Sequence, residues 1–591
     1  MNSTNARMFL WLGLVLALWL NYETWQRDYA VAEPAASAAA TKTQTAENSA
    51  LATEVPSGLP APAAATPPTA NAPTPPPALS GDLPAVPSVA APVAAPTNDA
   101  PAAPTPAVTA PPRVIRIATD VLDLEVSEQG ADLIGAELSK YPLVKGEAKP
   151  VHLFNRAPNE FYHLQTGLAG TAGVAAPTHL ARYSSAAAEY RLAPDAQELR
   201  VPFTWTDAAS GVTVTKTFVL RRGQYRIDLE YAVDNRGTSP WTVSSYAQIL
   251  RDDKPVERSM FSVESYAFKG PAYYNGTKYF KIDRQKVADA ELPREVTGGW
   301  IAGMQHHFVT AVVPAEGRAY RYSLKTQGDQ YLLAVSGPAQ TIAPQSGVNF
   351  AETLFVGPKL QAQLKTTGPR LDLVADYGRL TILAEPLFWL LEQAHKMVGN
   401  WGWAIILITM LLKLVFYPLS ESSGKSMAKM RLLAPRIKNL QDTYKDDREK
   451  LGRAMMDLYK REKVNPLAGC LPILIQMPVF FAFYWVLLES VEMRQTPFMF
   501  WIQDLSSKDP FFVLPLVMAG AMFVQYKLNP APPDPIQAKV FMIMPIFMSA
   551  TFAFFPAGLV LYWVTNTLLS IAQQWNINRR IEAGAKKAHS G

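Results

Sequence analysis

The sequence has few of the features that would point to a catalytic or cofactor-binding protein. Its single cysteine, Cys470, excludes an intramolecular disulfide framework. The pair His306 and His307 is accompanied by no HxxxH motif, no paired cysteines and no glycine-rich phosphate loop. A formal net charge of +5 is small for 591 residues and argues against a nucleic-acid-binding protein as a whole. We therefore expect no metal, no cofactor and no enzymatic residue set.

Branched and aromatic residues are scarce between residues 30 and 112, where proline and alanine dominate instead. Of the 49 prolines, 19 lie between Ala30 and Arg113. A stretch such as LPAPAAATPPTANAPTPPPALS has too little apolar surface to build a core. The composition predicts an extended, disordered linker over residues 30–112.

The first 29 residues contain a hydrophobic run that follows Arg7. The run MFLWLGLVLALWL has 13 residues, which suits a signal peptide, whereas a membrane span needs about 20. Tyr22 and Trp25 can extend it at the interface, and the sequence Ala30-Val31-Ala32, which resembles a cleavage site, lies far beyond its end. We favour a retained N-terminal anchor over residues 1–29 to a cleaved signal. In either case the following residues are exported.

Residues 113–370 have the two-residue period of β-strands. VTVTKTFVL (212–220) and YRIDLEYAV (225–233) alternate apolar and polar residues and are separated by Arg-Arg-Gly-Gln, the pattern of a β-hairpin. Repeated short strands broken by glycine, proline and asparagine predict an all-β antiparallel sandwich. We expect His306 and His307 to be strand histidines, with one facing outward.

The chain from residue 387 onward is rich in long apolar stretches. Five of them are candidate membrane spans, at residues 401–419, 469–488, 511–528, 540–555 and 558–575. With the N-terminal anchor they predict six transmembrane helices, of which five form a core over 401–580. Just before them, residues 371–400 include LAEPLFWLLEQAHKMVGN, which reads as an amphipathic helix lying at the outer membrane interface.

Basic residues fix the expected orientation. The segment between the second and third spans carries 12 Lys or Arg residues, so the positive-inside rule places it in the cytoplasm. Counting spans from there puts both termini in the cytoplasm and the β domain outside, and the basic tail 581–591 agrees. Within residues 420–468 apolar residues recur at spacings of three and four, which predicts a helical hairpin that docks partners by its basic surface. A solvated charged loop is the alternative.

Lys413 lies inside the apolar stretch IILITMLLKLVFYP. An exposed charge in lipid costs roughly 2.5 to 3.5 kcal/mol, so such residues usually face a wet cavity or the interior of a bundle. Snorkelling of its stem to the cytoplasmic interface is the alternative. The spans hold no Asp or Glu to pair with it except Glu489 near an outer end, which argues against an ion-coupled transporter. Polar residues that we expect to line the cavity are Thr409, Gln476, Gln525, Ser549, Thr551, Asn566 and Gln573.

Three stretches carry a resemblance to a known family. SMAKMRLLAPRIKNLQ, LYKREKVNPLAGCLPILIQMPVFFAFYWVL and FPAGLVLYWVTNTLLSIAQQ closely resemble the YidC/Oxa/Alb membrane protein insertases, in the long bacterial YidC form. The anchor, linker and β domain match that form in order and size. The resemblance implies an insertase and chaperone of the bacterial inner membrane, with a periplasmic β domain and five core helices around a hydrophilic groove.

The resemblance also implies residue roles and partners. The groove's basic residue, usually arginine, is here Lys413, which keeps the charge but not the planar fork. Phe480, Tyr562 and Trp563 are implied to contact the substrate, with core packing as the alternative, and Pro472 and Pro478 to bend a lateral gate. Implied partners are nascent membrane proteins, the Sec translocon, the ribosome and targeting receptor, and membrane lipids. Two other hypotheses are a small-molecule transporter and a membrane-tethered carbohydrate-binding protein.

Overall fold

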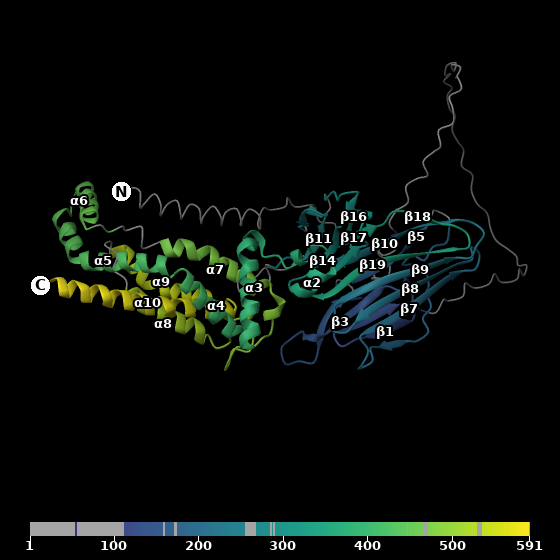
Figure 1. Cartoon of the computed structure of the whole chain (residues 1–591), viewed down its shortest axis with the longest axis horizontal. Helices are drawn as coiled ribbons and strands as arrows, with labels where there is room; N and C mark the ends of the chain where they lie inside the picture. The colour runs from purple at the N-terminus through teal and green to yellow at the C-terminus, as the bar shows by residue number, and fades with distance from the viewer. Residues whose placement is uncertain are drawn as a thin grey trace, which may run out of the picture.

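The structure is a computed structural model in which a β domain and a helical bundle lie at opposite ends, with helix α3 (Thr381–Val398) between them (Figure 1). It describes residues 54–55, 111–157, 160–170, 174–254, 267–283, 286–287, 290–445, 447–462, 464, 471–528 and 535–589. The expected anchor (1–29), almost all of the expected linker (30–112) and Cys470 lie outside the described residues.

The hairpin expected from the alternating pattern is present. Strands β8 (Val212–Arg221) and β9 (Arg226–Asn235) pair antiparallel, with Val214 opposite Val233. Alternate residues of β8 are buried because they face the opposite sheet of the domain, while the threonines between them are half-buried on the other face. The sequence period therefore determines which face of each strand enters the core.

The β domain contains two sheets whose described strands pair antiparallel, apart from one parallel pair, β1 with β6. The first sheet has eleven described strands: β1 Val114–Ala118, β2 Leu122–Ser127, β3 Leu133–Pro142, β4 Pro150–Phe154, β5 Tyr162–Gly170, β6 Glu189–Arg191, β10 Trp241–Asp252, β13 Val296–Thr297, β16 Ala319–Gln327, β17 Gln330–Ser336 and β18 Gln340–Ile342. The second has eight: β7 Glu198–Asp207, β8, β9, β11 Gly270–Tyr274, β12 Tyr279–Lys281, β14 Trp300–Met304, β15 Phe308–Pro314 and β19 Ser346–Pro358.

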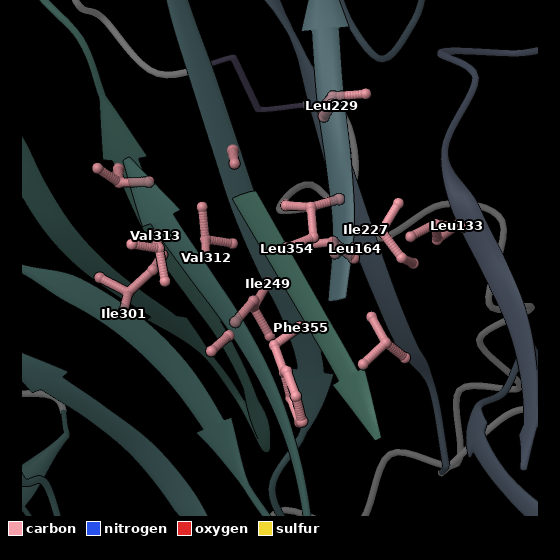
Figure 2. Close-up of a cluster of buried hydrophobic side chains, with 14 of the residues drawn as sticks. Leu133, Leu164, Ile227, Leu229, Ile249, Ile301, Val312, Val313, Leu354 and Phe355 are labelled. Atoms are coloured by element: carbon pink, nitrogen blue, oxygen red, sulfur yellow. The ribbon is translucent and has the colours of Figure 1, made fainter. Parts of the chain in front are cut away.

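The core of the β domain is the apolar layer between the two sheets. Leu164 and Ile249 come from the first sheet, and Ile227, Leu229 and Leu354 come from the second (Figure 2). All five side chains are fully buried. Removal of this apolar surface from water is the main source of the domain's stability.

The second half of the chain is helical and has its own apolar core. Its helices are α2 Gln361–Thr367, α3, α4 Trp401–Val415, α5 Tyr417–Thr443, α6 Arg448–Arg461, α7 Leu471–Glu489, α8 Val513–Leu528, α9 Pro535–Phe552 and α10 Ala557–His589, with short 3₁₀ turns at Leu371–Val374, Gly378–Leu380 and Val491–Met493. The stretch expected as one span over 401–419 is broken at Phe416, and the expected last span continues into the basic tail as one helix, α10.

No single helix of the described part is both long and apolar enough to cross a membrane by itself. Helix α4 and the first part of α5, Tyr417–Met430, meet the test together and are bent by 68° at their junction. Helix α8 and the segments Gln476–Glu489 and Ala538–Phe552 are apolar but shorter. The number of six transmembrane helices therefore stays a prediction.

The β domain and the bundle meet in a buried polar interface at the end of α7. Lys359 Nζ lies 3.9 Å from Glu489 Oε2, and both side chains are almost fully buried. In the neighbouring contacts, histidine, tyrosine, arginine and lysine side chains hydrogen-bond to main-chain oxygens or to a serine hydroxyl. They are His306 Nε2 to Leu488 O (2.9 Å), Tyr377 Oη to Ser490 Oγ (3.2 Å), Arg494 Nη2 to Pro142 O (3.1 Å) and Lys145 Nζ to Gln495 O (2.8 Å).

The expectation for the two histidines is wrong. His306 and His307 lie in the turn between β14 and β15, not on a strand, and His307 is 6% exposed. The stretch MQHHFVTAVV contains no glycine, proline or asparagine to mark the turn, which is why sequence reasoning extends the strand through the two histidines. Instead of facing outward, they lie beside the bundle, where His306 donates its Nε2–H to Leu488 O.

We expect the docking of the two domains to weaken in acid. Burial, with Lys359 as a nearby positive charge, lowers the pKa of His306 to about 4. A pKa below its unfolded value of about 6.5 means that the unfolded state binds the proton more readily. The contribution of neutral His306 to the free energy of unfolding is therefore complete above pH 6.5 and is lost as the pH falls towards 4. The largest possible loss from this one group is about 3 kcal/mol.

The measurement is the thermal unfolding midpoint of the full chain in detergent at pH 7 and pH 4.5. His306→Gln can still donate to Leu488 O but does not titrate in this range, so it should lose part of the pH dependence. His152→Gln, on the exposed edge of β4, is the matched control. An unchanged pH dependence in His306→Gln would contradict this assignment.

Candidate functional site

The sharp turn that sets the direction of α4 is encoded by two neighbouring residues. Gly399 takes a left-handed conformation (φ 67°) and ends α3, its N–H bonding to His395 O at 2.7 Å. Asn400 then caps α4, its side-chain oxygen accepting from the N–H groups of Gly402 and Trp403. Its Nδ2 also donates to Pro497 O and Phe498 O, which fixes the start of α4 against the loop before α8.

A small cavity of about 30 Å³ lies between α4, the start of α5, α7 and α10. The polar and charged side chains on its wall are Thr409, Lys413, Ser420, Gln476, Tyr562 and Asn566. The apolar ones are Leu412, Phe416, Leu419 and Val479. The break at Phe416 matters here, because it turns α5 away from α4 and brings both helices to the cavity wall.

Among the residues that the structure describes, Lys413 has one hydrogen-bond partner, and that partner is neutral. Its Nζ donates to Ser570 Oγ on α10 at 2.8 Å. The Ser570 hydroxyl in turn donates its proton to Asn566 O at 2.7 Å. Toward Lys413 the hydroxyl oxygen therefore acts as an acceptor, through a lone pair. The serine therefore positions the ammonium group without neutralising its charge.

The walls of the cavity contain no Asp or Glu, and Lys413 makes no ion pair with any residue that the structure describes. A charge held in a partly enclosed apolar space is screened less than one in open water. Such a cation attracts an anion that enters the cavity. The arrangement suits the transient binding of a carboxylate.

Comparisons with known proteins agree on the nature of the chain. Residues 114–390 match the family model described as YidC periplasmic domain, and residues 393–586 match that of the 60Kd inner membrane protein. A protein of Thioalkalivibrio sulfidiphilus (strain HL-EbGR7) named Membrane protein insertase YidC is 45% identical, over 99% of this chain and 100% of its own. This chain belongs to the YidC family of membrane protein insertases.

Other members of the YidC family extend the match. A Nitrosococcus oceani protein of the same name is 43% identical over 98% of this chain and 99% of its own. Among solved structures, one titled as an active YidC insertase with the first transmembrane domain resolved is 18% identical, with a TM-score of 0.36, over 78% of this chain and 93% of that one. The family is one of inner membrane proteins with a β-rich periplasmic domain, and its members are insertases rather than enzymes.

The structure of this YidC-family chain brings four of the eight predicted groove residues together: Lys413, Thr409, Gln476 and Asn566. Tyr562, predicted to contact the substrate, lines the same cavity. Thr409 is 1% exposed and its hydroxyl donates to Ile405 O within α4, so it contributes little free polarity. Gln476 Nε2 donates to Tyr562 Oη at 3.4 Å, which links α7 to α10 beside the cavity. Ser570 is a member of the site that sequence reasoning missed, although it lies one helical turn after Asn566 on the same face.

Four other residues expected in the groove do not line the cavity. Ser549 donates to Pro515 O of α8, and Thr551 donates to Phe547 O of its own helix at 3.0 Å. Gln525 is half-buried on α8, and Gln573 Nε2 is buried on α10 without a hydrogen-bond partner in the described part of the chain. The hydroxyls of Ser549 and Thr551 hydrogen-bond to helix backbone, which is an ordinary role of such groups in membrane helices.

The aromatic residues form a cluster beside the cavity. The Phe480 ring lies 6.3 Å from that of Tyr562 and 4.8 Å from that of Trp563, between centroids. Phe480 and Tyr562 are buried, which fits core packing, whereas Trp563 is half-buried. Pro478 lies inside α7, which continues through it as one helix, and Pro472 is the second residue of that helix.

The outer surface of the bundle is unusually apolar for a protein in water. Large apolar side chains are exposed on α3, α4, α8 and α9, including Ile382 (86%), Leu414 (69%) and Phe547 (68%). Contiguous exposed apolar surface of this kind marks a face that contacts lipid or another apolar partner. Helix α3 buries Leu387, Phe388 and Leu391 against the bundle while exposing Ile382 and Trp389, as expected of an interfacial helix.

Proposed function

We propose that this chain inserts nascent membrane proteins from the cytoplasm into the lipid bilayer, and that Lys413 receives an acidic segment of the substrate during the crossing. The observation that carries the proposal is the state of Lys413. The cation lies in a cavity whose described wall residues include no carboxylate, and its partner Ser570 leaves the charge uncompensated. A substrate carboxylate is the group that this cavity lacks.

The energetic role of such a cavity follows from the thickness of the membrane. A polar tail that crosses about 30 Å of hydrocarbon leaves its backbone groups unsatisfied at several kcal/mol each. A polar cavity that opens part-way shortens the apolar distance. The apolar span of the substrate then leaves sideways into lipid and gains roughly 25 cal/mol per Å² of buried apolar surface. No ATP hydrolysis is required by this scheme.

The same proposal assigns an orientation and partners. Both termini and the helices α5 and α6 lie in the cytoplasm, and the β domain lies in the periplasm, as the positive-inside rule favours. Leu433 and Ile437 of α5 form a small cluster with Val464, just after α6, and Met455 and Leu458 of α6 pack against it. This hairpin presents basic residues to solvent and would receive the ribosome, a targeting receptor, acidic lipids or the Sec translocon.

We further propose that Phe480, Tyr562 and Trp563 guide the apolar span of the substrate as it leaves the cavity. The half-buried Trp563 is the member of the cluster best placed for such a contact. Pro472 and Pro478 would permit the bending of α7 that lateral release requires. Pro478 removes a backbone hydrogen-bond donor from within the helix, whereas Pro472 lies in its first described turn, where the backbone N–H has no partner inside the helix.

The test is insertion of a single-span substrate with an acidic outer tail into liposomes that contain only this purified protein. Protease protection of the tail reports insertion. We expect protection to depend on the protein, and to fall when the tail's Asp and Glu residues are replaced by Asn and Gln. Equal protection in empty liposomes would refute insertase activity under these conditions. Equal protection of the acidic and neutral tails would refute the role given to the charge.

A further inference from the structure

A short piece of the proline-rich stretch lies on the β domain. Glu54 O accepts a hydrogen bond from Gln248 Nε2 at 3.0 Å, and the Glu54 carboxylate forms an ion pair with Lys325. Gln248 and Lys325 lie 194 and 271 positions further along the chain. The contacts are therefore tertiary, and they come from two different strands, β10 and β16.

Glu54 contacts the face of the first sheet that points away from the core. On β10, Ala247 and Ile249 belong to the core between the sheets, so Gln248 between them points to the opposite face. Gln165 on β5 is directly opposite Gln248 and shares that outer face. Gln248 is nevertheless 0% exposed and Gln165 is 6% exposed. Polar side chains that point away from the core and are still buried indicate that this face of the sheet is covered, and we call this covered surface the groove.

The chemistry of this groove matches an extended peptide. Gln248 Nε2 donates to Gln165 Oε1 at 2.8 Å as well as to Glu54 O, which uses both of its N–H groups. Its Oε1 is buried without a hydrogen-bond partner in the described part of the chain, so an acceptor for a further main-chain N–H is in place. Lys325 adds a positive charge at the rim of the groove. Gln248 and Lys325 therefore bind two parts of the same residue, the main-chain carbonyl and the carboxylate of Glu54.

We propose that the outer face of β5, β10, β17 and β16, which are consecutive in the sheet, is a peptide-binding groove, and that its occupant is this chain's own segment containing Glu54 and Val55. The sequence there, LATEVP, supplies Leu51 and Val55 around the acidic residue in a stretch dominated by alanine, proline and threonine. Because occupant and groove are in one chain, the effective concentration is high and a modest intrinsic affinity is sufficient.

Docking at Glu54 divides the proline-rich stretch into two arms. The arm from residue 30 to residue 53 spans at most roughly 80 Å when fully extended, whereas the whole stretch from 30 to 112 could span roughly 280 Å. The groove therefore limits how far the β domain can move from the N-terminal anchor. This consequence depends on the anchor being retained, but the groove itself does not.

The test places a photo-crosslinking amino acid, p-benzoylphenylalanine, at position 55 of the full chain in lipid nanodiscs. We expect crosslinks that map to β10, β16 and β17 by mass spectrometry. The matched control carries the same probe at Val86, another valine of the proline-rich stretch, and should give no concentration of crosslinks on those strands. Crosslinks from position 55 that are as scattered as those from position 86 would overturn the proposal.

Charge exchange tests the recognition itself. Glu54→Lys places two cations together and should lower the crosslink yield from position 55 at least threefold, as should Lys325→Glu. The double variant Glu54→Lys/Lys325→Glu should restore the yield, and Asp82→Lys is the matched control that should leave it unchanged. Because this ion pair is partly exposed, Gln248→Leu is a second test and should also reduce the yield. A yield that none of these changes alters would overturn the proposed groove.

Discussion

Lys413→Glu is expected to reduce the insertion of substrates with an acidic outer tail at least tenfold. The substitution replaces attraction by repulsion inside the cavity, and two charges 4 Å apart interact by about 4 kcal/mol near a protein surface. A tenfold change in an equilibrium requires only about 1.4 kcal/mol, so the expected loss is a conservative bound. The measurement is the initial rate of protease-protected insertion into liposomes that contain the purified variant.

Three further variants separate charge from structure. Lys413→Arg retains the charge and should retain at least half of the activity. Lys413→Met retains the apolar stem, so it should lose activity for an acidic tail and little for a neutral one. Ser570→Ala removes the hydroxyl that accepts the hydrogen bond from Lys413 but leaves the cation, so it should have a small effect. If the Glu variant inserted acidic tails at the normal rate, Lys413 would be an interfacial anchor and the cavity charge would have no role in transport.

The sequence predicts which residues line the cavity better than it predicts which way their helices face. Lys413, Thr409, Gln476, Tyr562 and Asn566 come together because each is polar or amphipathic within an apolar helix, a pattern that is visible in one dimension. The rotation of each helix about its axis decides which polar groups face inward. These helices carry apolar residues on all sides, so the sequence pattern does not indicate that rotation. For that reason Ser549 and Thr551 were expected in the groove although they serve helix contacts.

The break at Phe416 also escaped sequence reasoning. Pro418 is visible in the sequence, and proline is common in the first turn of a helix, which is where it stands in α5. The apolar run continues across the break without a change in composition, so it reads as one span. A short-range signal for a helix start was present, but the hydrophobic pattern outweighed it.

Contacts between the two domains were not predictable from one sequence. Lys359 and Glu489 are 130 residues apart, and neither stands in a recognisable motif. Their pairing depends on how the end of β19 meets the end of α7. In contrast, the β8–β9 hairpin was predictable because its period, its turn and its register are all local.

The second large effect concerns a lysine inside the β domain. Lys216 occupies an inward position of β8, in line with Val214 and Phe218, and is 0% exposed. Its Nζ donates to Gly130 O (2.8 Å), Ala131 O (2.9 Å) and Thr166 O (3.0 Å), which uses all three of its N–H groups. The side chain thereby ties the second sheet to a turn and a strand of the first.

Lys216→Ala should lower the free energy of unfolding of the β domain by about 3 to 5 kcal/mol. The change removes one member of a buried charged group that includes Asp132 and Glu352, leaves three buried carbonyl groups without their donor, and opens a cavity. Burial lowers the pKa of Lys216 to about 8, so at pH 7 the group that is lost is mainly the charged form.

Hydrogen exchange of the full chain, read by mass spectrometry, measures the effect strand by strand. Amides of β5, β8 and β9 should lose protection together in Lys216→Ala, because they depend on one shared core. Lys216→Met retains most of the volume and should recover the part of the loss due to the cavity, and Lys149→Met, in the exposed β3–β4 loop, should change nothing. Full protection in both Lys216 variants would mean that water replaces the ammonium group without cost, and that the three hydrogen bonds do not hold the sheets together.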